Sequence, residues 1–144
     1  MADLLSFIIN ILNRKITVDV SPEKFVFSDG HSTITLDTYL YLQSNSKGDH
    51  LVLAISEHVQ QATCVRVDLF DPKSVVPDKV LRSSCLGEFL RFGFAKLSSR
   101  KIMLRPTVMF RSAHTLDHIT CGYQKQILSD AAKNAGAHSV HFLD

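Results

Sequence analysis

The last forty residues constrain the fold more narrowly than any other part of the chain. Arg105–Phe110 is short and apolar, and His138–Leu143 alternates apolar with polar residues, so each predicts a strand. Between them, Asp117–Ala135 carries apolar residues at helical spacing, and Gly136 follows as a left-handed helix stop. This order predicts a βαβ unit, whose crossover is almost always right-handed.

The predicted helix should turn one apolar stripe toward the core. The stripe comprises Ile119, Tyr123, Ile127, Ala131 and Ala132. Asp117 stands where an N-cap is expected, which leaves His114 in the preceding loop. His114 and His118 are four residues apart, a spacing that can share a metal ion on one helix, but the expected cap separates them. With no third ligand nearby in sequence, no metal site is expected.

The first part of the chain predicts an antiparallel meander. Lys15–Val20, Glu23–Ser28 and His31–Asp37 alternate apolar with polar residues, as half-buried strands do. Asp29 and Gly30 form a strong hairpin turn pair between the second strand and the third. The three strands should therefore pair in sequence order.

The middle of the chain is less regular. Tyr39–Gln43, Leu51–Ile55 and Cys64–Phe70 predict short strands, and Asp78–Leu97 has helical spacing. Together with the terminal βαβ unit, this order predicts an α/β domain. We expect a mixed sheet of about five strands in spatial order 3-2-1-4-5, helices on both faces and a small insertion over residues 38–77.

Residues 1–13 predict an amphipathic helix in front of a single domain over residues 14–144. Asp3, Ser6, Asn10 and Asn13 recur at helical spacing and leave only a narrow polar face. The apolar positions expected to contact a partner or a membrane are Leu4, Leu5, Phe7, Ile8, Ile11 and Leu12. Such a face must be covered by the domain itself, by another chain or by a membrane surface. A signal peptide is a poor interpretation, because no basic region precedes the apolar residues.

Charge and cysteine content exclude several classes of function. The net charge of +2 is small and the basic residues are scattered, so no nucleic-acid partner is expected. Cys64, Cys85 and Cys121 form no CxxC pair, which indicates reduced thiols and a cytoplasmic location. None has a visible paired base, so buried small hydrophobes are expected rather than nucleophiles. No apolar run reaches the ~18 residues of a membrane-spanning helix.

Several segments resemble the bacterial actin MreB family. Ala131–Asp144 resembles its helix that ends in Ala-Gly-Ala, followed by a strand that ends in an acidic residue. Leu4–Leu12 resembles the membrane-binding start of some members, Lys15–Val20 their first strand, and Asp71–Asp78 the loop before their first long helix. The resemblance implies an actin-like (ribonuclease H-like) fold that binds nucleotide between two halves. This chain supplies at most one half.

Two positions depart from the family pattern. The family's first phosphate loop reads Asp-x-Gly-Thr, whereas here Asp19 is followed by Val20, Ser21 and Pro22. Proline has no backbone N–H to offer a phosphate. Gln124 stands where the family carries a Glu that positions the attacking water, and Gln cannot take a proton. Asp19, Ser21 and Gln124 are therefore interpreted as a vestigial nucleotide site, and no cofactor is expected.

The leading hypothesis is a non-catalytic assembly or interaction module of the bacterial cytoskeleton. It would self-associate, with a homodimer as the first expectation, or bind a cytoskeletal partner or the inner membrane surface from the cytoplasm. One alternative is an actin-like ATPase subunit whose nucleotide site a second chain completes. Another is a ribonuclease H-like hydrolase, with carboxylates drawn from Asp19, Asp37, Asp68 and Glu88.

Overall fold

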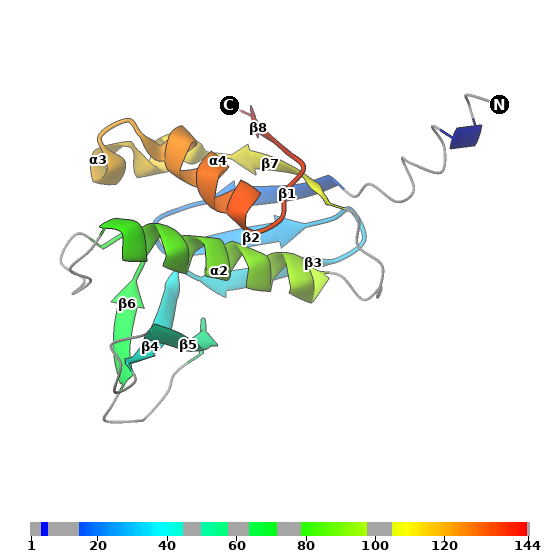
Figure 1. The fold of residues 1–144 in the computed structure, drawn as a ribbon. Coiled ribbons are helices and arrows are strands. Elements are labelled where there is room, and N and C mark those ends of the chain that lie inside the picture. Colours follow the sequence, from blue (N-terminus) through cyan, green and yellow to red (C-terminus); the bar gives the residue numbers. More distant parts are fainter. Residues whose placement is uncertain are drawn as a thin grey trace.

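A mixed five-stranded sheet forms the centre of the molecule in the computed structural model, which describes residues 4–5, 15–44, 50–57, 64–71, 79–97 and 105–143. Its strands are β1 (Lys15–Val20), β2 (Lys24–Ser28), β3 (Thr33–Asp37), β7 (Thr107–Arg111) and β8 (Ser139–Leu143). The spatial order is β3-β2-β1-β7-β8, with β1 antiparallel to β2 and parallel to β7 (Figure 1). The expected topology and the mixed α/β class are confirmed.

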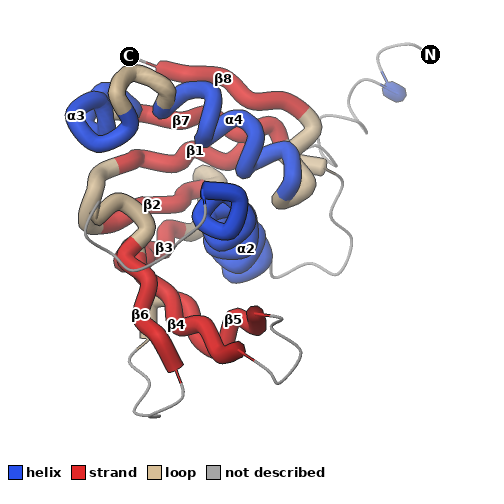
Figure 2. Tube along the Cα trace, turned by 60° about the vertical axis from the view of Figure 1, so that its left-hand side comes forward, coloured by secondary structure: helices blue, strands red, loops and turns tan. Residues whose placement is uncertain are grey.

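Two long helices, α2 (Lys79–Leu97) and α4 (Gln124–Asn134), pack side by side on one face of this sheet (Figures 1 and 2). Gly93 allows α2 to approach the sheet closely, whereas Gly87 has room for a side-chain carbon. A Cβ atom at Gly93 would lie 2.5 Å from the ring of Phe27 on β2, whereas one at Gly87 would lie 3.7 Å from the carbonyl oxygen of Ala131 on α4. Phe89 fills the space between helix and sheet, with its ring edge-on to Phe25 at 5.5 Å.

The opposite face of the five-stranded sheet carries no helix among the described residues. The expected cover on both faces is therefore seen on one face only. Strand alternation explains this, because Ile16, Val18 and Val20 point into the helix-covered core while Lys15 and Asp19 are exposed. A polar face of this kind does not need to be buried.

The predicted helix from Asp117 to Ala135 is wrong as a single element. The chain forms a 3-10 turn η1 (Ala113–Leu116) and a short α3 (Asp117–Thr120), and then breaks at Cys121 and Gly122, with φ of 55° and 85°. Asp117 is thus the first residue of α3 rather than an N-cap. Since α4 begins only at Gln124, the buried stripe rotates: Leu128 is buried and Tyr123 is 68% exposed.

The end of α4 agrees with the sequence prediction. Gly136 adopts a φ of 106°, the left-handed conformation expected of a helix stop. The amide of Ala137 donates to the carbonyl of Ala132 at 2.9 Å, and that of Gly136 donates to Lys133 at 3.1 Å. These two bonds form a Schellman motif, which satisfies the last carbonyls of the helix.

A second sheet of three antiparallel strands lies beside the first, in the order β5-β4-β6 (Figure 2). Its strands are β4 (Tyr39–Ser44), β5 (His50–Ile55) and β6 (Cys64–Asp68). They fall within the range expected for an insertion. One face buries Leu40, Leu42, Ile55 and Val67. In the described part of the chain, no helix is long and apolar enough to cross a membrane.

Candidate functional site

A cavity of about 640 Å³ lies where the two sheets meet, beside the tip of the β1–β2 hairpin. This volume is within the range of small-molecule sites. The described residues that line the cavity include six ionisable ones, Glu23, Asp37, Asp68, Asp71, Arg66 and His118. Among these described residues, four carboxylates outnumber one guanidinium and one imidazole. A polyphosphate would therefore meet more negative than positive charge from this part of the lining.

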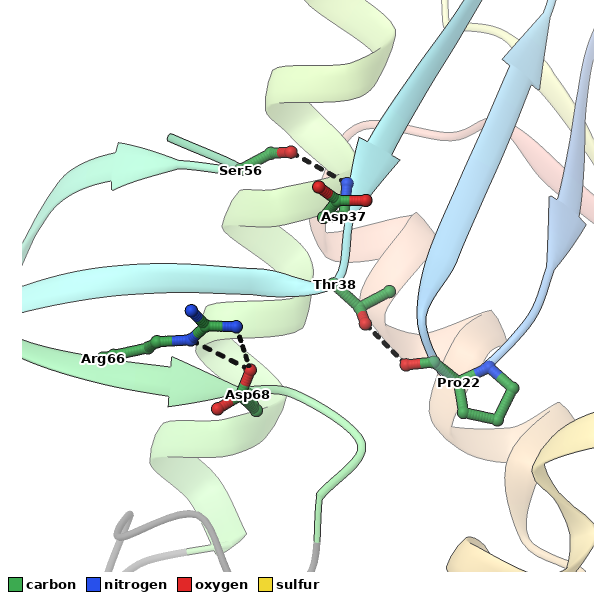
Figure 3. A network of polar contacts seen from close by, with 6 residues as sticks. All are labelled: Pro22, Asp37, Thr38, Ser56, Arg66 and Asp68. Atoms are coloured by element: carbon green, nitrogen blue, oxygen red, sulfur yellow. Dashed lines mark hydrogen bonds and ion pairs between the residues drawn. The ribbon is translucent and has the colours of Figure 1, made fainter. Parts of the chain in front are cut away.

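Thr38 ties the hairpin tip to the second sheet. Its hydroxyl donates to the carbonyl oxygen of Pro22 at 2.5 Å, and its amide donates to the carbonyl of Glu23 at 3.1 Å. Its own carbonyl accepts from the amide of Leu69 at 2.9 Å. Next to it, the amide of Asp37 donates to the hydroxyl of Ser56 at 2.8 Å (Figure 3). The junction between the sheets is therefore held by hydrogen bonds on both sides.

The β1–β2 tip closes on itself. The amide of Ser21 donates to the carbonyl of Lys24 at 3.1 Å, and the amide of Lys24 donates to the Ser21 hydroxyl at 3.2 Å. Pro22 contributes no amide, and its carbonyl oxygen points toward Thr38 (Figure 3). Phosphate loops need backbone N–H groups that converge on the anion. Here two amides of the tip are used inside the turn.

Arg66 supplies a guanidinium to the described lining of the cavity. Its Nε and Nη2 atoms donate to one carboxylate oxygen of Asp68 at 3.1 and 3.0 Å (Figure 3). The guanidinium also lies 4.0 Å from the ring centroid of Tyr39. The hydrogen bond with Asp68 raises the pKa of Arg66 above its ordinary value, against an opposing effect of burial. The positive charge of Arg66 is therefore already paired within the chain.

Gln124 and Asp19 are not part of the cavity lining. Gln124 is buried at the start of α4, where its Nε2 donates to Asp117 Oδ1 and its Oε1 accepts from the Thr120 hydroxyl at 3.1 Å. Both the nitrogen and the oxygen of its side-chain amide thus form hydrogen bonds across the break between α3 and α4. Asp19 is exposed on the open face of the five-stranded sheet. Of the three residues interpreted as a vestigial site, Ser21 alone sits at the hairpin tip beside the cavity.

The other candidate chemistry is dispersed. Asp37 and Asp68 line the cavity, but Glu88 pairs with Arg91 on the surface of α2 at 2.6 Å. Within the described ranges, no three His, Cys, Asp or Glu side chains are placed to hold a metal ion. The ribonuclease H-like cluster of four carboxylates is therefore not assembled.

The three cysteines differ in accessibility. Cys85 is buried in α2, and burial, with a smaller contribution from Glu88, raises the pKa of its thiol to about 11. A thiol of that pKa is protonated at neutral pH and is a poor nucleophile. Cys121 is exposed at the break before α4 and Cys64 is partly exposed on β6. The expectation that all three are buried is wrong for Cys121.

The N-terminal contact residues are described only at Leu4 and Leu5. Both are helical, and each is 63% exposed. Phe7, Ile8, Ile11 and Leu12 lie outside the described residues.

Sequence reasoning missed the junction at Thr38 and the pairing of Arg66 with Tyr39. A weak signal existed, because Thr38 directly joins two predicted strands, and a buried backbone there needs hydrogen-bond partners. Arg66 and Tyr39 lie on neighbouring strands, and their contact depends on the register that pairs Tyr39 with Asp68 and Tyr41 with Arg66. That register is not readable from either strand alone.

Replacing Thr38 with valine should lower the free energy of unfolding by about 1–3 kcal/mol, because the partly buried carbonyl of Pro22 loses its donor. Thr35→Val on the exposed face of β3 is the matched control and should change stability by less than about 0.5 kcal/mol. Urea denaturation measures both values. Equal costs for the two variants would contradict the role assigned to Thr38.

The fold is that of part of an actin-like protein. MreB 5 of Spiroplasma citri, bound to AMPPNP, matches with a TM-score of 0.53 at 14% sequence identity over 92% of this chain. The non-polymerising A278D mutant of MamK, also bound to AMPPNP, matches with a TM-score of 0.57 at 10% identity over 90% of this chain. This confirms, at the level of fold, the resemblance found in the sequence.

The chain spans only 38% and 41% of the length of these two structures. Neither a protein-family model nor a curated protein matches the sequence.

Proposed function

We propose that the chain is a non-catalytic assembly module of the bacterial cytoskeleton, built on an actin-like half-fold. It associates with copies of itself or with a cytoskeletal partner, in the cytoplasm or at the inner membrane surface. The observation that carries the proposal is the closed β1–β2 tip. The amide of Ser21 donates to the carbonyl of Lys24, and the amide of Lys24 donates to the hydroxyl of Ser21. The carbonyl of Pro22 accepts from the hydroxyl of Thr38.

The charge of the cavity supports the same proposal. Both similar structures are bound to AMPPNP, whose phosphates are anionic. In this chain the described lining of the cavity presents four carboxylates, and the guanidinium of Arg66 is already paired with Asp68. Gln124, at the position where the family carries a Glu, holds Asp117 and Thr120 instead of facing the cavity.

One observation favours the alternative function, an actin-like ATPase subunit. The cavity volume of about 640 Å³ is large enough for a nucleotide. An actin-like ATPase subunit completed by a second chain would use that volume, with phosphate donors supplied by the partner.

Isothermal titration calorimetry with ATP and Mg²⁺ separates the two functions. The purified chain should show no binding at micromolar dissociation constants, which correspond to about −8 kcal/mol. The double variant Ser21→Gly with Pro22→Thr restores the family's loop pattern, so it is the matched test of whether the tip alone prevents binding. Micromolar binding by the unmodified chain would refute a non-catalytic module. Binding only after a second protein is added would favour the completed ATPase.

A further inference from the structure

An apolar groove of about 570 Å³ lies between the first turns of α2 and the break that separates α3 from α4. Of the residues that line it, Phe70 and Leu86 are buried, Ile119 and Ile127 are half-buried, and Tyr123 is exposed. Among the described residues that line it, none carries a charge. The groove therefore suits an apolar, uncharged occupant.

The N-terminal segment has the matching chemistry. Leu4–Leu12 contains seven apolar residues out of nine. Leu4 and Leu5 are helical and among the most exposed large apolar side chains of the described chain. Arg14 and Lys15 are the only basic residues next to this segment in the sequence. Binding to an anionic membrane is strengthened by a cluster of several basic residues. A neutral protein groove fits this segment better than a lipid surface does.

The segment and the groove lie at opposite ends of β1. The described segment of residues 4–5 lies beyond the amino end of β1, on the side of the molecule away from α3 (Figures 1 and 2). The groove lies past the carboxyl end, where the hydroxyl of Thr115 donates to the carbonyl of Val20 at 3.1 Å and α3 follows.

The lengths of β1 and of the predicted N-terminal helix favour a groove on a second molecule over the groove of the same chain. The six residues of β1 span roughly 17 Å. The helix that the sequence predicts over residues 1–13 would cover about 15 Å between Leu4 and residue 13. A predicted helix of that length, attached before β1, would not bring Leu4 and Leu5 into a groove that begins past the other end of the strand.

We infer that the N-terminal segment of one molecule docks in the apolar groove between α2 and the α3–α4 break of a second copy of this chain. The inference rests on the proposed assembly function and names its contact. Donor and acceptor are different surfaces, so the contact is heterologous.

Disulfide trapping between two different proteins tests the contact. The first carries Leu5→Cys with Cys64→Ser and Cys121→Ser. The second carries Cys64→Ser, keeps the exposed Cys121 at the groove, and bears a tag that changes its mass. Oxidation of the mixture should give a mixed disulfide dimer on a non-reducing gel, because a disulfide forms only when the two Cα atoms come within about 7 Å.

Leu51→Cys in place of Leu5→Cys is the matched control, since Leu51 is 58% exposed but lies on β5. It should give little mixed dimer. Equal yields from the two positions, or no dimer from Leu5→Cys, would overturn the inference. So would an internal disulfide in a single chain that carries both Leu5→Cys and Cys121.

Sedimentation provides a second test. Leu4→Asp with Leu5→Asp should raise the dissociation constant of self-association by about 100-fold, and Tyr123→Asp by about tenfold, both with unchanged circular dichroism. Unaltered association in these variants overturns the groove contact while the assembly function stands. A wild-type chain that is monomeric at ~100 µM also overturns the groove contact. ATP binding by the wild type refutes the non-catalytic function and leaves the cross-link unaffected.

Discussion

Replacing Phe89 with alanine should lower the free energy of unfolding by about 3–5 kcal/mol, the usual cost of removing a fully buried phenylalanine. Phe89 packs edge-on against Phe25 at 5.5 Å and also contacts Phe27, with ring centroids 6.2 Å apart. These rings join α2 to β2. Since domains of this size are stable by only about 5–15 kcal/mol, the variant should lose a large part of its stability.

Phe92→Ala is the matched control, because Phe92 is on the same helix but only partly buried, beneath the ammonium group of Lys96. It should cost less than half as much as Phe89→Ala. Urea denaturation followed by circular dichroism measures both midpoints. Similar losses in the two variants would show that α2 does not pack on the sheet through Phe89.

Replacing Gln124 with glutamate should destabilise the chain by about 2–4 kcal/mol at pH 7, although glutamate is the residue that the resemblance to MreB leads one to expect here. The Nε2 atom of Gln124 donates to Asp117, and a carboxylate there would lose that bond and face a like charge. The site is only 7% exposed, so water screens the repulsion poorly.

The effect of Gln124→Glu should depend on pH. Burial and the Asp117 carboxylate both raise the pKa of the new carboxyl above its unfolded value of about 4.3. The penalty is therefore absent below that pH, grows as the pH rises above it, and is complete above the folded pKa. Urea denaturation at a series of pH values between about 3 and 8 measures it.

Gln126→Glu makes the same chemical change on the same helix. Its side chain donates to Asp130 at 3.1 Å, but the pair is exposed. The cost should be only a few tenths of a kcal/mol and nearly independent of pH. If the two variants were equally stable, Gln124 would not be buried against Asp117, and its position at the start of α4 would have to be revised.

The strands and their order follow from local sequence signals. Lys15–Val20 alternates so regularly that its buried side could be assigned without a structure, and Asp29 with Gly30 fixes the reversal between β2 and β3. Gly136 ends α4 because only a glycine adopts its left-handed conformation at low cost. Each signal lies within a few residues of the element that it specifies.

The helix before Gly136 shows where a local signal misleads. Apolar spacing continues through Cys121 and Gly122, so the periodicity predicts one uninterrupted helix. The tertiary structure breaks it there, where Gln124 bonds to Asp117 and Thr120 across the gap. A glycine inside a helical pattern is tolerated or breaks the helix according to its surroundings, which periodicity does not include.

The sequence by itself determined the type and order of the strands, the actin-like resemblance and the departure of Ser21 and Pro22 from the MreB phosphate-loop pattern. The tertiary structure alone decided what replaces that pattern. Thr38 reaches the carbonyl of Pro22 across 16 residues, and Thr115 reaches that of Val20 across 95. Period and turn chemistry act between neighbours in sequence, whereas these bonds depend on which strands pair and in which register.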